Sequence, residues 1–87
     1  MDITVAKGIF SSKDAEELIT QIIHIKIKYH EMKASAGRYD SRIVKMREKQ
    51  IIQLQKDLFE FQRYIQHNPD KIYLNAGIEI IGYEAQN

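Results

Sequence analysis

The chain has 87 residues, no cysteine and a formal net charge of +1 at pH 7, with 44% hydrophobic and 29% charged residues. This composition is typical of one small soluble domain over residues 1–87, and it argues against a disordered chain. A chain without cysteine has no disulfide and no thiolate metal site, which agrees with a cytoplasmic location. Because its apolar runs are short, we expect no secretion signal, no membrane span and no membrane partner.

The first predicted element is a short strand over residues 3–10. Ile3, Val5 and Ile9 alternate with more polar residues and would therefore lie on one face of the strand. A strand of this kind buries one face and leaves the other in solvent.

A helix is predicted over residues 12–34, because Ser11 and Ser12 offer N-cap hydroxyls and acidic residues follow in the first turn. Apolar residues then recur at alternating spacings of three and four, as in a coiled-coil seam. This seam consists of Ala15, Leu18, Ile22, Ile25, Tyr29 and Met32. An alternative is a strand over residues 23–29, where isoleucines alternate with polar residues. We favour the helix because the three-four spacing covers the whole segment.

A second helix is predicted over residues 41–67. Gly37 is a natural left-handed terminator of the first helix, and Asp40 or Ser41 can cap the second. The spacing of three and four returns, and only Arg47 interrupts its apolar character. The second seam consists of Val44, Arg47, Ile51, Leu54, Leu58, Phe61 and Ile65.

The second helix should end at Asn68–Pro69, because proline disfavours helical geometry in the residue before it. A strand is predicted over residues 71–81. One face of it would carry Ile72, Leu74, Ala76, Ile78 and Ile80. The predicted fold class is therefore α+β and mainly α, with the order β-α-α-β. An antiparallel, coiled-coil-like helical hairpin would carry the two terminal strands, paired at its base.

Both helices have more apolar surface than one seam requires. Ile52 and Phe59 are seven residues apart and lie about 100° round the helix from the second seam. Either the small sheet folds back over Ile52 and Phe59, or a second copy of the chain covers them. We expect the second copy, and hence a homodimer. The residues predicted to mediate self-association are Ile23, Ile27, Ile52 and Phe59.

The sequence contains no constellation that points to catalysis. His24, His30 and His67 do not have the i, i+4 spacing of a helical metal pair, and the glycines do not form a phosphate-binding loop. The carboxylates are scattered along the chain rather than paired. We therefore expect no enzyme activity, no cofactor and no metal site.

The middle of the chain is basic. Residues 26–49 carry eight lysines and arginines and three acids, whereas both flanking segments are net negative. This charge would gather at the tip of the hairpin. There it is either a solvated face or a site for an anionic partner, such as nucleic acid or an acidic protein surface. The candidate residues are Lys33, Arg38, Tyr39, Arg42, Lys45, Arg47 and Lys49.

Two functions fit these patterns. The first is a non-enzymatic interaction and assembly module, which self-associates through its helices and binds a protein partner. The alternative is a non-specific nucleic-acid-binding protein that uses the basic tip. Sequence-specific DNA recognition is not indicated, because the chain has no zinc finger or helix-turn-helix spacing.

Overall fold

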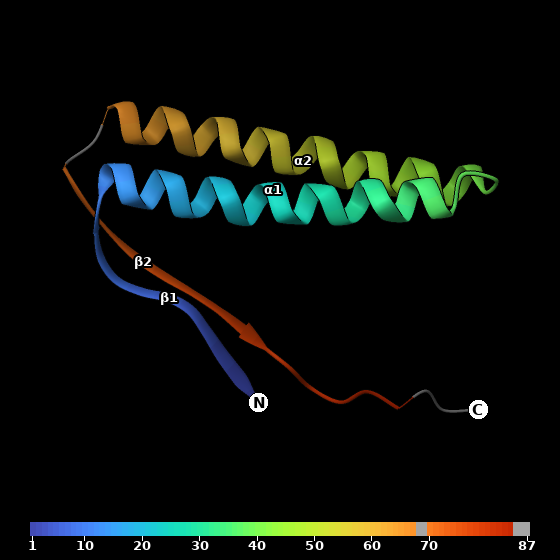
Figure 1. The fold of residues 1–87 in the computed structure, drawn as a ribbon, viewed down its shortest axis with the longest axis horizontal. Helices are drawn as coiled ribbons and strands as arrows, with labels where there is room; N and C mark the ends of the chain where they lie inside the picture. Colours follow the sequence, from blue (N-terminus) through green and yellow to red (C-terminus); the bar gives the residue numbers. More distant parts are fainter. Residues whose placement is uncertain (68–69, 85–87) are drawn as a thin grey trace.

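The computed structural model describes residues 1–67 and 70–84, which form two strands and two helices (Figure 1). The elements are β1 (Asp2–Ser11), α1 (Ser12–Ala36), α2 (Ser41–Gln66) and β2 (Lys71–Glu79). The helices form a long antiparallel hairpin, and the strands pair antiparallel as a two-stranded sheet. This confirms the predicted mainly helical α+β hairpin, with residues 23–29 in a helix rather than a strand.

Both helices begin at a side-chain cap that the sequence predicts. The Ser11 hydroxyl accepts a hydrogen bond from the Asp14 N–H at 3.1 Å, and the Asp14 carboxylate complements the helix dipole. Asp40 Oδ1 accepts a hydrogen bond from the Arg42 N–H at 2.9 Å at the start of α2. The predicted stop at Asn68–Pro69 lies outside the described residues.

Gly37 follows the last residue of α1 as predicted, but its conformation is not left-handed. Its φ is −97°, which other residues also adopt, and its N–H donates to the Lys33 carbonyl oxygen at 3.0 Å. A Cβ at this position would lie 2.6 Å from Ile43 Cγ2. A larger residue here would force the Ile43 side chain in the first turn of α2 to move, so the position favours glycine.

The seam predicted on α2 faces α1. All seven of its residues, from Val44 to Ile65, are half-buried, whereas nearly all residues between them are exposed. The seam includes Arg47, so its polar side chain lies in the contact between the helices. The spacing of three and four on α2 therefore identified the correct face.

The predicted seam on α1 is wrong over its second half. Ile25, Tyr29 and Met32 are 71%, 48% and 59% exposed. The face buried toward α2 lies beside it and consists of Ile19, Ile23, Ile27, His30 and Ala34. Both sets of residues have helical spacing. The set that packs ends in the small residue Ala34, three residues before Gly37, where the chain lies close to Ile43 of α2.

Strand β1 contains a bulge that the sequence did not reveal. Its pairing with β2 is regular around Phe10, opposite Ile72, but the register shifts between Thr4 and Ala6. The bulge inserts Val5 into β1 and changes the face on which the following side chains lie.

The bulge makes the predicted apolar face of β1 wrong. Ile9 is 72% exposed, whereas Ala6 is 8% exposed and Phe10 is half-buried. On β2, which has no inserted residue, Ile72 and Leu74 are half-buried as the alternation predicts. A single extra residue thus reverses the face assignment in β1 and leaves that of β2 intact.

The sheet is attached to the hairpin only at its base. The Ser12 N–H donates to the Asp70 carbonyl oxygen at 2.8 Å, which joins the start of α1 to the start of β2. From this point the strands run away from the hairpin, on the side of α1 that is remote from α2 (Figure 1). The N-terminal part of α1 therefore lies near the sheet, and its C-terminal part does not.

This arrangement leaves the chain almost without a core. Among residues 1–67 and 70–84, the buried apolar side chains are Ala6 and Ala15 alone. The radius of gyration is 16.2 Å, whereas a compact chain of this length has a radius of about 12 Å. The hairpin and the sheet are thus two thin layers that spread apart.

The contact between Gly37 and Ile43 predicts an asymmetric effect of alanine. Gly37→Ala should lower the free energy of unfolding by about 1–3 kcal/mol, because the new methyl group overlaps Ile43 Cγ2. The measurement is urea denaturation followed by circular dichroism.

The matched control is Gly82→Ala, where nothing lies within 4 Å of the new Cβ. Addition of Ile43→Ala to Gly37→Ala removes the overlapping atom and should restore part of the loss. An unchanged midpoint for Gly37→Ala would contradict the close approach of α2 to α1.

Candidate functional site

The basic residues at the hairpin tip are partly held by their neighbours. The Arg38 guanidinium lies 4.8 Å from the centre of the Tyr39 ring, which is itself 90% exposed. Arg42 Nε lies 3.6 Å from Asp40 Oδ1 in an exposed ion pair. Such pairs contribute little to stability, so these side chains can exchange their neighbours for another anion or ring.

Lys33 on α1 also lies near an aromatic ring, that of Tyr29 on the same helix. Its Nζ lies 5.6 Å from the centre of the Tyr29 ring, and the Arg47 guanidinium carbon lies 5.8 Å from the same ring. Two cations of the predicted anion site therefore flank one half-exposed tyrosine. This contact orients Lys33 along α1 and toward Tyr29.

Arg47 is directed into the seam, opposite the buried side chain of His30. Arg47 Nη1 lies 3.0 Å from His30 Nδ1 and 3.4 Å from Gln50 Oε1. A guanidinium group has only donors, so Nδ1 accepts and the neutral imidazole carries its proton on Nε2. Arg47 is therefore a polar residue of the helix contact, unlike the other predicted anion-site residues, which are all exposed.

This environment favours the neutral form of His30. Burial lowers the pKa of His30 below its usual value of 6.5, and the positive charges of Arg47 and Lys26 lower it further. A lowered pKa in the folded chain means that the unfolded chain binds the proton more tightly. Stability is then fully present above about pH 7.5 and declines as the pH falls through 6.5 toward the lower folded pKa.

We predict that the urea midpoint falls between about pH 8 and pH 5, because protonation of His30 breaks its bond from Arg47. His30→Gln should flatten this dependence, since glutamine keeps an acceptor but does not titrate. His24→Gln is the matched control, because His24 is exposed. Equal slopes for His30→Gln and the unaltered chain would contradict the role of His30.

The remaining basic residues of α2 lie on the face opposite its seam, which we call the outer face of α2. Its members recur at alternating spacings of three and four, and all are exposed. They are Arg42, Lys45, Lys49, Ile52, Lys56, Phe59 and Arg63. The basic surface is therefore a stripe along the helix rather than a cluster at the tip. Sequence reasoning missed Lys56 and Arg63 because they lie beyond the basic middle of the chain, although their helical spacing from Lys49 could have found them.

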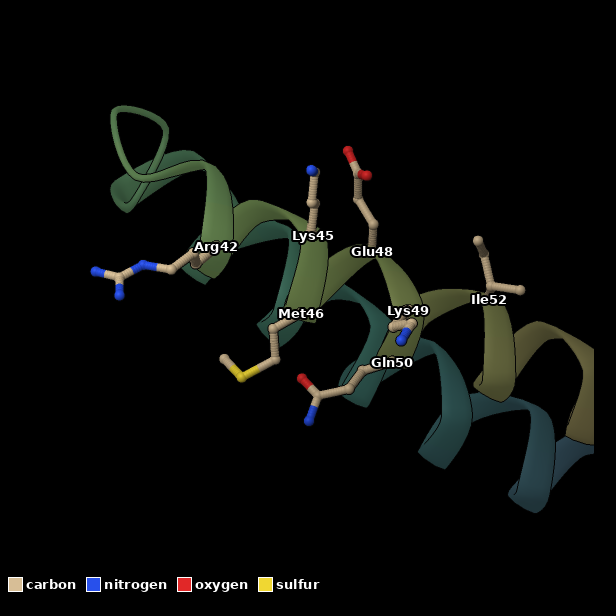
Figure 2. Close-up of a pocket in the computed structure, with 7 residues that line it drawn as sticks. All are labelled: Arg42, Lys45, Met46, Glu48, Lys49, Gln50 and Ile52. Atoms are coloured by element: carbon tan, nitrogen blue, oxygen red, sulfur yellow. The ribbon is translucent and has the colours of Figure 1, made fainter.

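The outer face is hollowed by open grooves. One groove of about 720 Å³ lies along α2 from Arg42 to Ile52, with Lys45, Glu48 and Ile52 projecting on one side and Met46 and Gln50 on the other (Figure 2). A second groove of about 300 Å³ continues along the helix beside Ile52 and Phe59. The outer face therefore offers apolar side chains between rows of charged ones.

The four residues predicted to mediate self-association do not form one surface. Ile52 and Phe59 are 51% and 60% exposed on the outer face of α2. Ile23 and Ile27 are half-buried on the face of α1 that packs against α2. Of the four, only Ile52 and Phe59 are readily available to a partner.

A second apolar surface, half-buried at Leu18 and Ile22 and exposed from Ile25 onward, lies on α1, and we call it the α1 stripe. It consists of the residues predicted to form the seam after Ala15, namely Leu18, Ile22, Ile25, Tyr29 and Met32. Leu18 and Phe10 line one open groove, so the Leu18 end of the stripe lies beside the sheet. The sheet adds further exposed apolar residues, including Ile78 at 49% and Ile81 at 74%.

Within residues 1–67 and 70–84, no three His, Asp or Glu side chains are grouped so that they could hold a metal ion. Neither α1 nor α2 has a stretch that is long and apolar enough to span a membrane. Comparison of the chain with protein-family models, curated proteins and solved structures finds no match.

Proposed function

We propose that the chain is a non-enzymatic assembly module whose second copy supplies the missing half of its core. The observation that carries this proposal is the near-absence of buried apolar side chains, since Ala6 and Ala15 are the only buried apolar residues among the described ones. A chain of this size must bury apolar area to offset its conformational entropy, and it has no disulfide to help.

The exposed area supports a partner of matching size. The accessible surface is 7406 Å², whereas a compact monomer of 10.2 kDa exposes about 5,300 Å². The excess is about 2,100 Å² per chain, or roughly 4,000 Å² for two copies, which lies within the range of obligate homodimer interfaces.

We place the interface on the α1 stripe and the adjoining sheet. This surface is apolar, and Ile25, Met32 and Ile78 on it are about half exposed or more. A symmetric dimer places the same patch of both copies together, so its patch must tolerate itself. The side chains of the α1 stripe are themselves uncharged, with Lys33 and Arg47 beside its Tyr29 ring, and the rest of the stripe meets this condition.

The outer face of α2 is less suitable for contact with itself. In a symmetric dimer, its lysines and arginines would lie opposite the same cations of the second copy. Ile52 and Phe59 stay predicted self-association residues that no observation tests. Their charged surroundings lead us to prefer the α1 stripe.

Sedimentation equilibrium of the full chain at micromolar concentration tests the proposal. We expect a mass of roughly twice 10.2 kDa. The double variant Ile25→Glu with Met32→Glu should dissociate the dimer and reduce its helical circular dichroism, because charged groups then enter the apolar interface.

The matched control is Ile52→Glu with Phe59→Glu, which adds the same charge to the outer face of α2. This control should remain a dimer. If only the control variant becomes a monomer, the interface lies on α2 instead. If the unaltered chain is a folded monomer, self-assembly is contradicted altogether.

A further inference from the structure

The outer face of α2 carries charged side chains, whereas the α1 stripe proposed for self-association is made of uncharged ones. Five cations lie along it with Ile52 and Phe59 between them, and both apolar side chains are at least half exposed. We propose that this face binds an acidic amphipathic helix of a partner protein. The proposal concerns a different face from the dimer contact and does not rest on it.

The spacing of the outer face suits a helical partner. Its residues from Arg42 to Arg63 follow the three-four repeat of a coiled-coil seam, over about 32 Å of helix. The open grooves beside Lys49 and between Ile52 and Phe59 can receive side chains from such a helix. A partner helix would thus place apolar residues on Ile52 and Phe59 and acidic residues on the flanking cations.

The charge of the outer face determines the sign of the partner. Arg42 pairs with Asp40, and the other four cations form no ion pair with any other residue in the described part of the chain. Glu48 lines the first groove and Glu60 the second, so the five cations outnumber these two acids and leave the face net positive. Opposite charge speeds association and excludes partners that carry the same charge.

The apolar residues distinguish a helix from nucleic acid. A duplex backbone offers phosphates to cations but no apolar surface for Ile52, and Phe59 already lies beneath the Arg63 guanidinium at 6.0 Å. An amphipathic helix matches both the cations and the apolar side chains. Nucleic acid is therefore the competing outcome of the test.

The probe is a fluorescent synthetic helix of about four heptads, with leucine along its seam and glutamate beside it. Fluorescence anisotropy at low salt should show binding to the full chain, which weakens as salt rises. A peptide with lysine in place of glutamate should bind at least about tenfold more weakly.

Charge reversal provides the decisive variant. Lys49→Glu with Lys56→Glu should exchange the preference, so that the basic peptide binds better than the acidic one. Lys13→Glu with Lys28→Glu makes the same charge change at exposed positions of α1 and should leave the acidic peptide bound. Ile52→Ala with Phe59→Ala should weaken both peptides by at least about tenfold.

Three results would overturn the proposal. Binding of neither peptide means that the outer face is only solvated. Tighter binding of a duplex DNA than of the acidic peptide, with loss in the Lys49→Glu and Lys56→Glu variant, assigns the face to nucleic acid. An unchanged preference after charge reversal places the contact elsewhere. Sedimentation of the same samples reports dimerisation separately, so failure of one proposal is distinguishable from failure of the other.

Discussion

The contact between α1 and α2 determines where every other part of the chain lies. The half-buried seam of α2 packs against α1, so the two helices lie antiparallel. The close approach of Gly37 to Ile43 fixes the turn between them. Because the two helices have nearly equal lengths of 25 and 26 residues, the end of α2 returns to the start of α1. The strands can then pair at the base, held there by the bond from Ser12 to Asp70. The same contact buries one face of each helix and leaves other apolar residues of both helices exposed, which gives the chain its two candidate binding surfaces.

The sequence predicts α2 better than α1 for a physical reason. On α2 one face alone carries the apolar repeat, and polar residues separate it from Ile52 and Phe59. On α1 isoleucines occupy two adjoining faces, and both have helical spacing. The choice between them depends on where small residues let the helices approach, which is a tertiary effect. The β1 bulge at Val5 is unpredictable in the same way, because one inserted residue changes the face without changing the alternation of the sequence.

The candidate site was predicted in composition but not in shape. Arg42, Lys45 and Lys49 lie on the outer face of α2, but they belong to a stripe that continues well past the tip. Counting charges along the sequence indicates only the basic middle of the chain. Helical geometry extends the basic surface further, to Lys56 and Arg63. Arg47 belongs to another environment, because it meets His30 inside the hairpin. Its polar contact favours one pairing of the two helices over shifted ones, as a polar residue in a coiled-coil seam does.

The central claim is that a second copy completes the core of this chain. Its most direct test is the dependence of thermal or urea unfolding on protein concentration, because a dimer that unfolds to two chains obeys mass action. Dilution by about a hundredfold should lower the unfolding free energy by about 2.7 kcal/mol of dimer and shift the midpoint accordingly. A midpoint that is identical at both concentrations, with a cooperative transition, would contradict the claim.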